Sequence, residues 1–245
     1  MGSTDRTSFL HEDGESFREP ARVTARRVSA DRFFESRRSG CETRVVNAHT
    51  TLALVRHGET DWNAQKRLQG SSDIPLNDTG RAQVRATAVS MRGDEWDFIV
   101  CSPLSRARES AEILGAELGI EVIGQLPAIV ERDYGPAEGL QDSEELRALR
   151  IPGGFIGAET EEEVSARSTE ALTELVSTHR GKRIIVVAHG TLIRLAMKTL
   201  TGEPIDTISN AAHSVMLHSR AEDDTHLWRV VVVNGVVYDE SPLSR

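Results

Sequence analysis

Cysteines and long apolar segments are scarce in this sequence, and each shortage excludes a class of protein. Its 245 residues include two cysteines, Cys41 and Cys101, which are too few for a disulfide framework and do not form a metal-binding pair. This usage favours a reduced, cytoplasmic setting. No apolar run reaches the roughly 20 residues that span a bilayer, and the N-terminus lacks the apolar core of a signal peptide. We therefore expect no association with membranes.

Positive charge is also in short supply. The chain has 29 Lys and Arg residues against 38 Asp and Glu residues, a net charge of -9. This balance argues against nonspecific binding of nucleic acid. A small anion must then be held by local cations rather than by the field of the whole protein. The length and the 38% of hydrophobic residues suffice for one large domain with a core and are marginal for two.

The first 50 residues differ in composition from the rest. They contain nine Arg, no Lys, eight acidic residues and little apolar periodicity. We expect a disordered or weakly ordered extension over residues 1–50, followed by one domain over residues 51–245. An Arg- and Ser-rich start is typical of transit peptides, but those are poor in acidic residues. We favour a dispensable tail, or a translation start further along the chain, over a targeting role.

From residue 51 onward, short apolar segments alternate with segments of helical periodicity. The predicted strands are 51–56, 97–101, 121–123, 183–188, 215–217 and 227–233. Helices are predicted to begin at Asn77 or Thr79, at Ser102-Pro103, at the capping box of Thr160 and Glu163, and at Gly190. This alternation implies an α/β fold, a three-layer α/β/α sandwich with a mainly parallel central sheet.

Three of the predicted strands end beside chemically active side chains. The first ends at Arg56 and His57, the second is followed by Arg106, and the fourth is followed by His189. Because ligands of open α/β sheets bind beyond the carboxyl ends of the strands, we expect these four side chains to converge. Arginine forks match phosphate oxygens, and the N-termini of the helices after the second and fourth strands add N–H donors. The sequence therefore predicts a pocket for a small phosphoester.

The same residues belong to a longer, ordered set of motifs. In chain order these are LVRHGET (54–60), WN (62–63), QG (69–70), PLN (75–77), SPLSRA (102–107), ERDYG (131–135), EGL (138–140) and VAHG (187–190). From about residue 51 to residue 220, the set resembles the histidine phosphatase superfamily, also called the phosphoglycerate mutase-like family. A lone RHG is weak evidence, whereas an ordered set in the expected structural context is strong evidence. The resemblance implies the phosphoglycerate mutase-like fold.

The resemblance also implies a role for each matching residue. His57 would be the nucleophile and become phosphohistidine, with its other ring nitrogen held as a donor by a nearby backbone carbonyl. Arg56, Arg106 and His189 would bind the nonbridging phosphate oxygens and stabilise the charge of a loose transition state. The two arginines would also lower the pKa of the imidazole and keep it neutral. Glu131 would protonate the leaving oxygen and then take a proton from the attacking water.

Further residues are candidates for contacts with the substrate, namely Asn63, Gln69, Gly70, Arg132 and Gly190. Asn63 is expected to donate to the phosphate, whereas Arg132 either contacts the substrate or faces water. The chain has neither HExxH nor CxxC, so we expect no metal and no cofactor, with the cations of the pocket in place of a metal.

Access of water to the phosphohistidine would separate a phosphatase from a mutase. The mutase branch of the family carries a long insertion between the acid-base loop and the second histidine. Here that stretch, residues 132–188, is short and has no paired arginines to hold a glycerate carboxylate. We therefore expect a phosphatase acting on a small phosphorylated metabolite, with a phosphoglycerate mutase as the alternative. A homodimer stays open.

Two departures from the family pattern bear on the substrate. The family's PGGES segment is replaced by PGGFIGAET (152–160), and Ala137 stands where many relatives carry an aromatic residue. Phe155 and Ile156 either form an apolar lid over the site or pack on the core. A phosphate-binding scaffold without activity would lack a catalytic residue, and a dinucleotide binder would carry GxGxxG after its first strand. Neither alternative fits the sequence.

Overall fold

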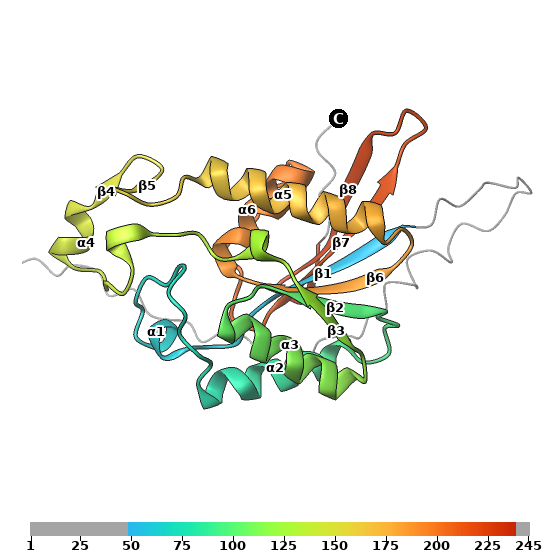
Figure 1. The fold of residues 1–245 in the computed structure, drawn as a ribbon, viewed down its shortest axis with the longest axis horizontal. Helices are drawn as coiled ribbons and strands as arrows, with labels where there is room; N and C mark the ends of the chain where they lie inside the picture. Colours follow the sequence, from blue (N-terminus) through green and yellow to red (C-terminus); the bar gives the residue numbers. More distant parts are fainter. Residues whose placement is uncertain (1–48, 239–245) are drawn as a thin grey trace, which may run out of the picture.

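A mixed sheet of seven strands lies at the centre of residues 49–238, the part of the chain that the computed structural model describes. The strand order is β3-β2-β6-β1-β7-β8-β9 (Figure 1). The strands are β1 (Thr50–Arg56), β2 (Phe98–Cys101), β3 (Val122–Gln125), β6 (Arg183–Ala188), β7 (His213–Arg220), β8 (His226–Val233) and β9 (Val236–Val237). β3, β2, β6 and β1 run parallel, and β7, β8 and β9 extend the sheet in antiparallel pairs.

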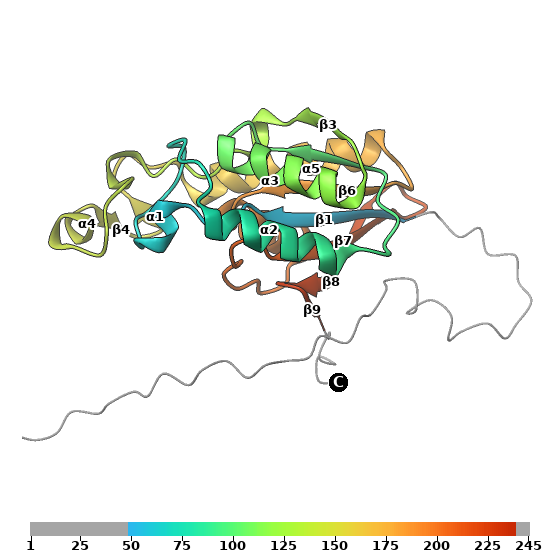
Figure 2. The same cartoon turned by 90° about the horizontal axis from the view of Figure 1, so that it is seen from below.

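Helices cover both faces of this sheet (Figures 1 and 2). One face carries α5 (Glu161–Thr178) and α6 (Gly190–Thr201), and the other carries α2 (Asp78–Met91) and α3 (Ser105–Leu118). These layers confirm the predicted three-layer fold. Smaller elements, α1 (Asp61–Ala64), α4 (Glu144–Ala148), β4 (Arg150–Ile151) and β5 (Gly154–Phe155), gather at the left end of Figure 1. The 3-10 helices are η3 (Pro127–Ile129) and η4 (Gly135–Ala137).

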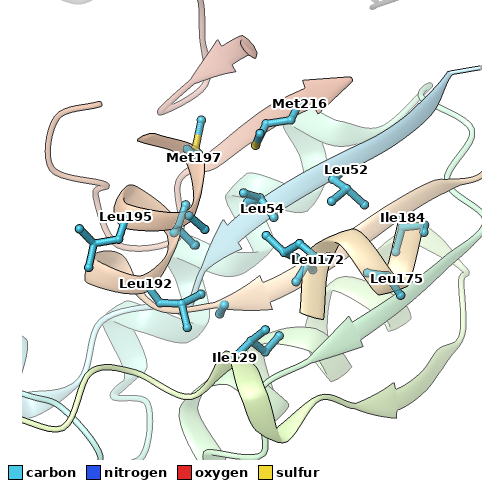
Figure 3. Packing of buried hydrophobic residues seen from close by; sticks show 14 of the residues in the cluster. Leu52, Leu54, Ile129, Leu172, Leu175, Ile184, Leu192, Leu195, Met197 and Met216 are labelled. Carbon is cyan, nitrogen blue, oxygen red and sulfur yellow. The ribbon is translucent and has the colours of Figure 1, made fainter. Parts of the chain in front are cut away.

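Alternating side chains along β1 build both halves of the core. Leu52 and Leu54 belong to the cluster formed with α5 and α6, whereas Ala53 and Val55 belong to the cluster formed with α2 and α3. Figure 3 shows the first cluster, with Leu172 of α5 packed beside the two β1 leucines. Burying a leucine side chain stabilises a fold by roughly 1.5–3 kcal/mol. A strand that is apolar on both faces is therefore stable only between two helical layers.

The register of the central strands aligns their carboxyl ends. Arg56 of β1 lies opposite Ala188 of β6, and Cys101 of β2 lies opposite Val187 of β6. The chain leaves all three strands at the same edge of the sheet, where the arrowhead of β1 points toward α1 in Figure 2. The residues that follow these strands therefore lie on one side of the molecule, as the sequence predicts.

Helix starts are predicted in part. The capping box of Thr160 and Glu163 at α5 is confirmed, and so is Asn77 as the N-cap of α2. The predicted start of α3 is wrong, because the N-cap is Leu104 rather than Ser102 and no side chain caps the helix. The hydroxyl of Ser102 has another partner, Nε2 of His189 at 2.8 Å. The third predicted strand is also displaced, since β3 pairs with β2 over residues 122–125 rather than 121–123.

The predicted N-terminal extension lies outside the described residues except for its last two positions. Thr50 already belongs to β1. The C-terminal residues 239–245 lie outside the described range as well. Between residues 49 and 238, no helix has both the length and the apolar character needed to cross a membrane.

Phe155 packs inward rather than covering the site as a free lid. It contacts a small apolar cluster around Tyr134, Ala137 and Leu146, and its ring meets the Tyr134 ring edge-on with centroids 6.0 Å apart. Ile156 differs, with 52% of its surface exposed. Of the two alternatives for this segment, a lid over the site or packing on apolar residues, Phe155 therefore follows the second.

Two glycines bring α2 against the segment that follows β1. A Cβ atom on Gly58 would lie 2.4 Å from the carbonyl oxygen of Gly80, and a Cβ on Gly80 would lie 2.1 Å from the carbonyl oxygen of Glu59. Both obstacles are backbone atoms, which cannot rotate away as a side-chain end can. Any larger residue would therefore push α2 away from the residues next to His57.

We expect Gly80→Ala to lower the free energy of unfolding by about 2–3 kcal/mol, because the added methyl group overpacks a rigid contact. Urea denaturation followed by circular dichroism measures the change. Gly124→Ala is the matched control, since a Cβ there meets no atom within 4 Å, and it should shift stability by less than about 1 kcal/mol. Equal stability of the two variants would contradict the close contact.

Candidate active site

The imidazole of His57 is buried just beyond the end of β1, with 3% of the residue exposed. Its backbone N–H donates to Ala188 and its carbonyl accepts from the N–H of Ala211, both at 3.0 Å. Nδ1 lies 2.7 Å from the carbonyl oxygen of Gly58. Because a carbonyl oxygen can only accept, Nδ1 carries the proton and Nε2 of the neutral ring keeps its lone pair.

Burial and the charges of Arg106 and Arg56 hold the pKa of His57 well below its usual range. Burial has the largest effect because it removes the water that would solvate an imidazolium ion, and the two guanidinium groups add like-charge repulsion. The hydrogen bond to Gly58 acts in the opposite direction and is outweighed. The ring is therefore neutral at physiological pH, and the lone pair of Nε2 accepts a hydrogen bond from Nε of Arg106.

Arg106, in the first turn of α3, has a fully buried guanidinium. Its Nη1 and Nη2 atoms donate to the carbonyl oxygens of Ser72 and Gly70, each at 2.7 Å. Its Nε lies 3.3 Å from Nε2 of His57. Burial lowers the pKa of Arg106 to about 10, so the group remains cationic at neutral pH. Two carbonyls thus hold a cation directly beside the lone pair of His57.

Gln69 and Gly70, two predicted substrate contacts, pack around this guanidinium. With its amide oxygen turned toward Arg106, Gln69 accepts from Nε at 2.8 Å and donates to the hydroxyl of Thr60. A Cβ on Gly70 would lie 2.3 Å from a carboxylate oxygen of Glu138, so glycine is required for this close packing. A substrate contact by either residue stays a prediction.

His189 follows β6 and is fully buried, with its ring centroid 5.2 Å from that of His57. Burial, with Arg106 next in effect, lowers the pKa of His189 well below its usual range, so the ring carries one N–H. Its Nε2 is paired with the hydroxyl of Ser102, and its Nδ1 has no partner among the described residues. A Ser102 hydroxyl that donates to Nε2 leaves the proton on Nδ1, where it can bind a ligand oxygen.

Arg56, the last residue of β1, supplies the second guanidinium. Its Nη1 donates to the carbonyl of Ile208 at 2.7 Å, whereas its Nε is buried without a hydrogen-bond partner in the described part of the chain. Burial lowers the pKa of Arg56, and the charge of Glu131 opposes this. A Cβ on Gly190 would lie 3.2 Å from Nε, so the glycine leaves room for this side chain.

Glu131 is 6% exposed, and its carboxylate lies at the N-terminus of α6. It accepts from the N–H groups of Thr191 and Leu192, each at 3.1 Å, and from that of Arg132 at 2.9 Å. Arg167 of α5 donates to the Glu131 carbonyl oxygen at 3.2 Å. The carboxylate and its backbone are therefore both held in place, which a proton-transfer group requires.

The N-termini of α3 and α6 are expected from the sequence to donate N–H groups to a bound phosphate. In the structure, a carboxylate of the protein accepts from each of them. Asp73 accepts from the N–H and the hydroxyl of Ser105 at the start of α3, both at 2.7 Å. Glu131 occupies the first turn of α6. The N–H groups in these bonds are therefore not available to a phosphate, whose charge has to be met by the guanidinium and imidazole groups. Gly190 as a substrate contact stays a prediction.

Asn63, on α1, lies beside a cavity of about 330 Å³. Its Oδ1 accepts from the side-chain amide of Asn210 at 2.9 Å. Arg56 and Asn210 also line the cavity, together with Lys66, Arg67, Asp142 and three leucines. The cavity therefore adjoins Arg56 of the cluster around His57, and three of its lining residues carry positive charge.

The side chain of Arg132 points away from the cluster around His57. Its Nε and Nη2 donate to the carbonyl oxygens of Glu159 and Gly153, at 2.7 and 3.1 Å, and the residue is 5% exposed. The alternative that Arg132 faces water is therefore wrong. A direct contact with the substrate stays a prediction.

Further residues support the site that were not predicted from the sequence, among them Arg167 and Asn210. Arg167 holds the backbone before Glu131, and its place between the inward-facing Val164 and Ser168 of α5 was a usable signal. Asn210 lies in a segment that forms neither helix nor strand. No periodic pattern singles out Asn210.

The charges nearest His57 come from the guanidinium groups of Arg106 and Arg56. Within residues 49–238, no three His, Cys, Asp or Glu side chains are grouped so that they could hold a metal ion. The fold is a three-layer α/β sandwich, and its site surrounds one neutral histidine with two arginines and a second histidine. This combination is typical of enzymes that act on phosphoryl groups.

Comparison with known proteins identifies the family. The profile described as histidine phosphatase superfamily (branch 1) matches residues 52–235. The chain therefore belongs to the histidine phosphatase superfamily.

Individual relatives agree with this assignment. The uncharacterized phosphatase PhoE of Bacillus subtilis is 37% identical over 182 residues, which cover 74% of this chain and 92% of PhoE. The probable phosphoglycerate mutase GpmB of Photorhabdus laumondii is 35% identical over 62% of this chain and 74% of GpmB. A mycobacterial glucosyl-3-phosphoglycerate phosphatase, solved with VO3, has a TM-score of 0.66 at 28% identity and covers 75% of this chain and 98% of its own. The expected family, fold and enzyme class, a hydrolase of phosphate monoesters, are confirmed.

The depressed pKa of His57 leads to a titration experiment. We expect the ring to stay neutral well below pH 6.5, and Arg106→Met to raise its pKa, because one source of like-charge repulsion is removed. Burial remains, so the pKa stays below the ordinary value. Histidine NMR measures both midpoints, with Arg108→Met, an exposed position on α3, as the control. An ordinary midpoint, or the same midpoint in all three proteins, would contradict the electrostatic arrangement.

Proposed function

We propose that this chain hydrolyses small phosphomonoesters in two steps, through a phosphohistidine on His57. The observation that carries the proposal is the position of Nε2 of His57, an unprotonated nitrogen 3.3 Å from Nε of the buried Arg106. A lone pair beside a fixed cation suits attack on an anionic phosphorus centre, because the cation offsets the charge of the approaching group. The domain over residues 51–245 would carry the whole reaction.

In the first step, Nε2 of His57 forms a bond to phosphorus while the bond from phosphorus to the leaving oxygen breaks. Arg56, Arg106 and Nδ1–H of His189 bind the three nonbridging oxygens, over which a loose transition state spreads its charge. Positioning and charge therefore account for most of the rate enhancement. Asn63 adds a further donor from α1.

Glu131 supplies the proton that the leaving oxygen needs. It gives this proton as the ester bond breaks, and as a carboxylate it then takes a proton from the water that attacks phosphohistidine. The second step releases inorganic phosphate and restores neutral His57 and protonated Glu131. The three backbone N–H groups that hold the carboxylate support this role, because they keep it in one place for both steps.

The cavity next to Arg56 supports a small substrate. Its volume of about 330 Å³ lies at the lower end of the range for ligand pockets, which is roughly 300–1,000 Å³. Lys66 and Arg67 line it together with Arg56 and would meet the negative charge of a phosphorylated substrate. We infer that the leaving group of a small phosphorylated metabolite occupies this cavity. A cytoplasmic location, without nucleic acid or membrane as partner, is part of the same proposal.

Mutase activity is the second candidate, and the relative described as a probable phosphoglycerate mutase favours it. A mutase must exclude water from phosphohistidine while its intermediate turns around. Between Arg132 and His189, the additions to the sandwich are α4 and the short pair β4 and β5. Residues 132–188 also lack adjacent arginines to hold a glycerate carboxylate. Hydrolysis is therefore the proposal that we favour.

Removal of the nucleophile tests the first step. His57→Ala should lower kcat/KM for phosphomonoesters by at least about 1,000-fold, because no other group replaces the lost nitrogen. A phosphate-release assay with chelator measures this loss, and wild-type activity should persist in chelator. His179→Asn, at the far end of α5, is the control histidine. Activity that chelator abolishes, or that survives in His57→Ala, would contradict the proposal.

Glu131→Gln tests the proton donor. Aryl esters with good leaving groups should lose little activity, whereas alkyl esters should lose about 100-fold or more, because only poor leaving groups need the proton. The measurement is kcat/KM across leaving groups of graded pKa, and Glu162→Gln, exposed on α5, is the control. Equal losses for all esters would exclude Glu131 as the acid.

Hydrolysis and mutase activity are separated by one parallel assay. Interconversion of 2- and 3-phosphoglycerate, primed with bisphosphoglycerate, should be slower than hydrolysis of the best monoester. Faster interconversion would favour the mutase.

A further inference from the structure

The orientation of the Arg106 guanidinium depends on residues 70–75, a segment without regular secondary structure. The carbonyls of Gly70 and Ser72 fix its guanidinium, each at 2.7 Å. Residues 70–75 form neither helix nor strand, so no helix or strand ladder holds these carbonyls in place. The segment therefore helps to set the direction in which Nε of Arg106 points, together with Gln69, whose amide oxygen accepts from that Nε.

The carboxylate of Glu138 holds the first part of this segment, whereas Asp73 joins the second part to Ser105 of α3. One oxygen accepts from the N–H of Ser71 at 2.7 Å, from the Ser71 hydroxyl at 3.0 Å and from the N–H of Tyr134 at 3.2 Å. The other accepts from the N–H of Ser72 at 2.8 Å and from the Ser72 hydroxyl. A carboxylate that accepts five hydrogen bonds fixes both serines.

Packing around the carboxylate is equally close. A Cβ on Gly70 would lie 2.3 Å from Oε1 of Glu138. Next to this contact, the N–H of Leu68 donates to the carbonyl of Leu140 at 2.9 Å, and the N–H of Gly139 donates to the carbonyl of Leu68 at 2.8 Å. The chain around residues 68–72 is therefore bonded both to the side chain of Glu138 and to the backbone that follows it.

Glu138 is ionised in this position. Burial alone would raise its pKa, but the hydrogen bonds from Ser72, Ser71 and Tyr134 outweigh burial and lower it. The charge of Glu138 in turn raises the pKa of Arg106 against the effect of burial. Ser72 lies between the two charges, with its N–H donated to Glu138 and its carbonyl accepting from Arg106.

We propose that Glu138 is a positioning residue for phosphoryl transfer, which aims Arg106 at the phosphate through Ser71 and Ser72. No hydrogen bond joins Glu138 to His57 in the described part of the chain, so Glu138 acts on the site through the bonds of this segment and through its charge near Arg106. The inference rests on the proposed function of the His57 site, because Arg106 needs a phosphoryl group to bind.

The variant Glu138→Gln tests the proposal at constant size. The amide nitrogen of the glutamine would face N–H and O–H donors where the carboxylate oxygen accepts. We expect residues 70–75 to shift as a result, and the guanidinium of Arg106 to change its orientation. We expect kcat/KM to fall by about 10- to 100-fold, as for a misplacement of about 1 Å in a catalytic group. The dissociation constant of inorganic phosphate, measured by calorimetry, should rise in parallel. Glu145→Gln, exposed on α4, is the control.

A double-mutant cycle distinguishes positioning from general support of the fold. If Glu138 acts through Arg106, Glu138→Gln should change phosphate affinity less than about twofold in an Arg106→Met background, because the two losses are not additive. Glu138→Asp, which keeps the charge, should retain more activity than Glu138→Gln. A full loss in both backgrounds, or no loss in either, would overturn the proposal.

Two further measurements keep the outcomes distinguishable. If circular dichroism shows that Glu138→Gln does not fold, Ser72→Ala replaces it in the same double-mutant cycle. Ser72→Ala should weaken phosphate binding less than Glu138→Gln, and it should have no further effect in the Arg106→Met background. If the wild-type protein hydrolyses no phosphomonoester, the proposed function fails. The phosphate dissociation constants then still decide whether Glu138 positions Arg106.

Discussion

The hydrogen bond from Nδ1 of His57 to the carbonyl of Gly58 determines which atom of the site can react. It places the proton on one ring nitrogen and leaves the lone pair of the other beside Arg106. The remaining features preserve this state. Burial and two guanidinium groups keep the ring neutral, and Glu138 holds the loop that aims one of those groups. An acidic protein thus concentrates cations at one point, and backbone carbonyls hold both guanidinium groups.

The part of the site that lies on strand ends could be predicted from the sequence. β1 and β6 are apolar on both faces, so they had to be central and parallel, and parallel strands end at the same edge of a sheet. That reasoning alone brings Arg56, His57 and His189 together. Arg106 follows because it lies in the first turn of the helix after the next parallel strand.

The rest of the arrangement depends on irregular segments, whose paths follow no period. Asp73 and Glu138 fill positions that pattern analysis leaves open, and Asp73 occupies the helix N-terminus that the sequence assigned to phosphate. Arg132 lies beside Glu131 in the sequence, but the backbone carbonyls of Glu159 and Gly153 direct its side chain elsewhere. Such contacts are set by tertiary packing, which a motif does not specify.

Chemical identification of the phosphorylated atom tests the central claim most directly. The enzyme is mixed with a phosphomonoester, quenched in alkali and digested, and the phosphorylated peptide is examined by mass spectrometry and phosphorus NMR. We expect one phosphoryl group, on Nε2 of His57. A phosphoryl group on Nδ1 of that ring, on His189 or on any other side chain would contradict it.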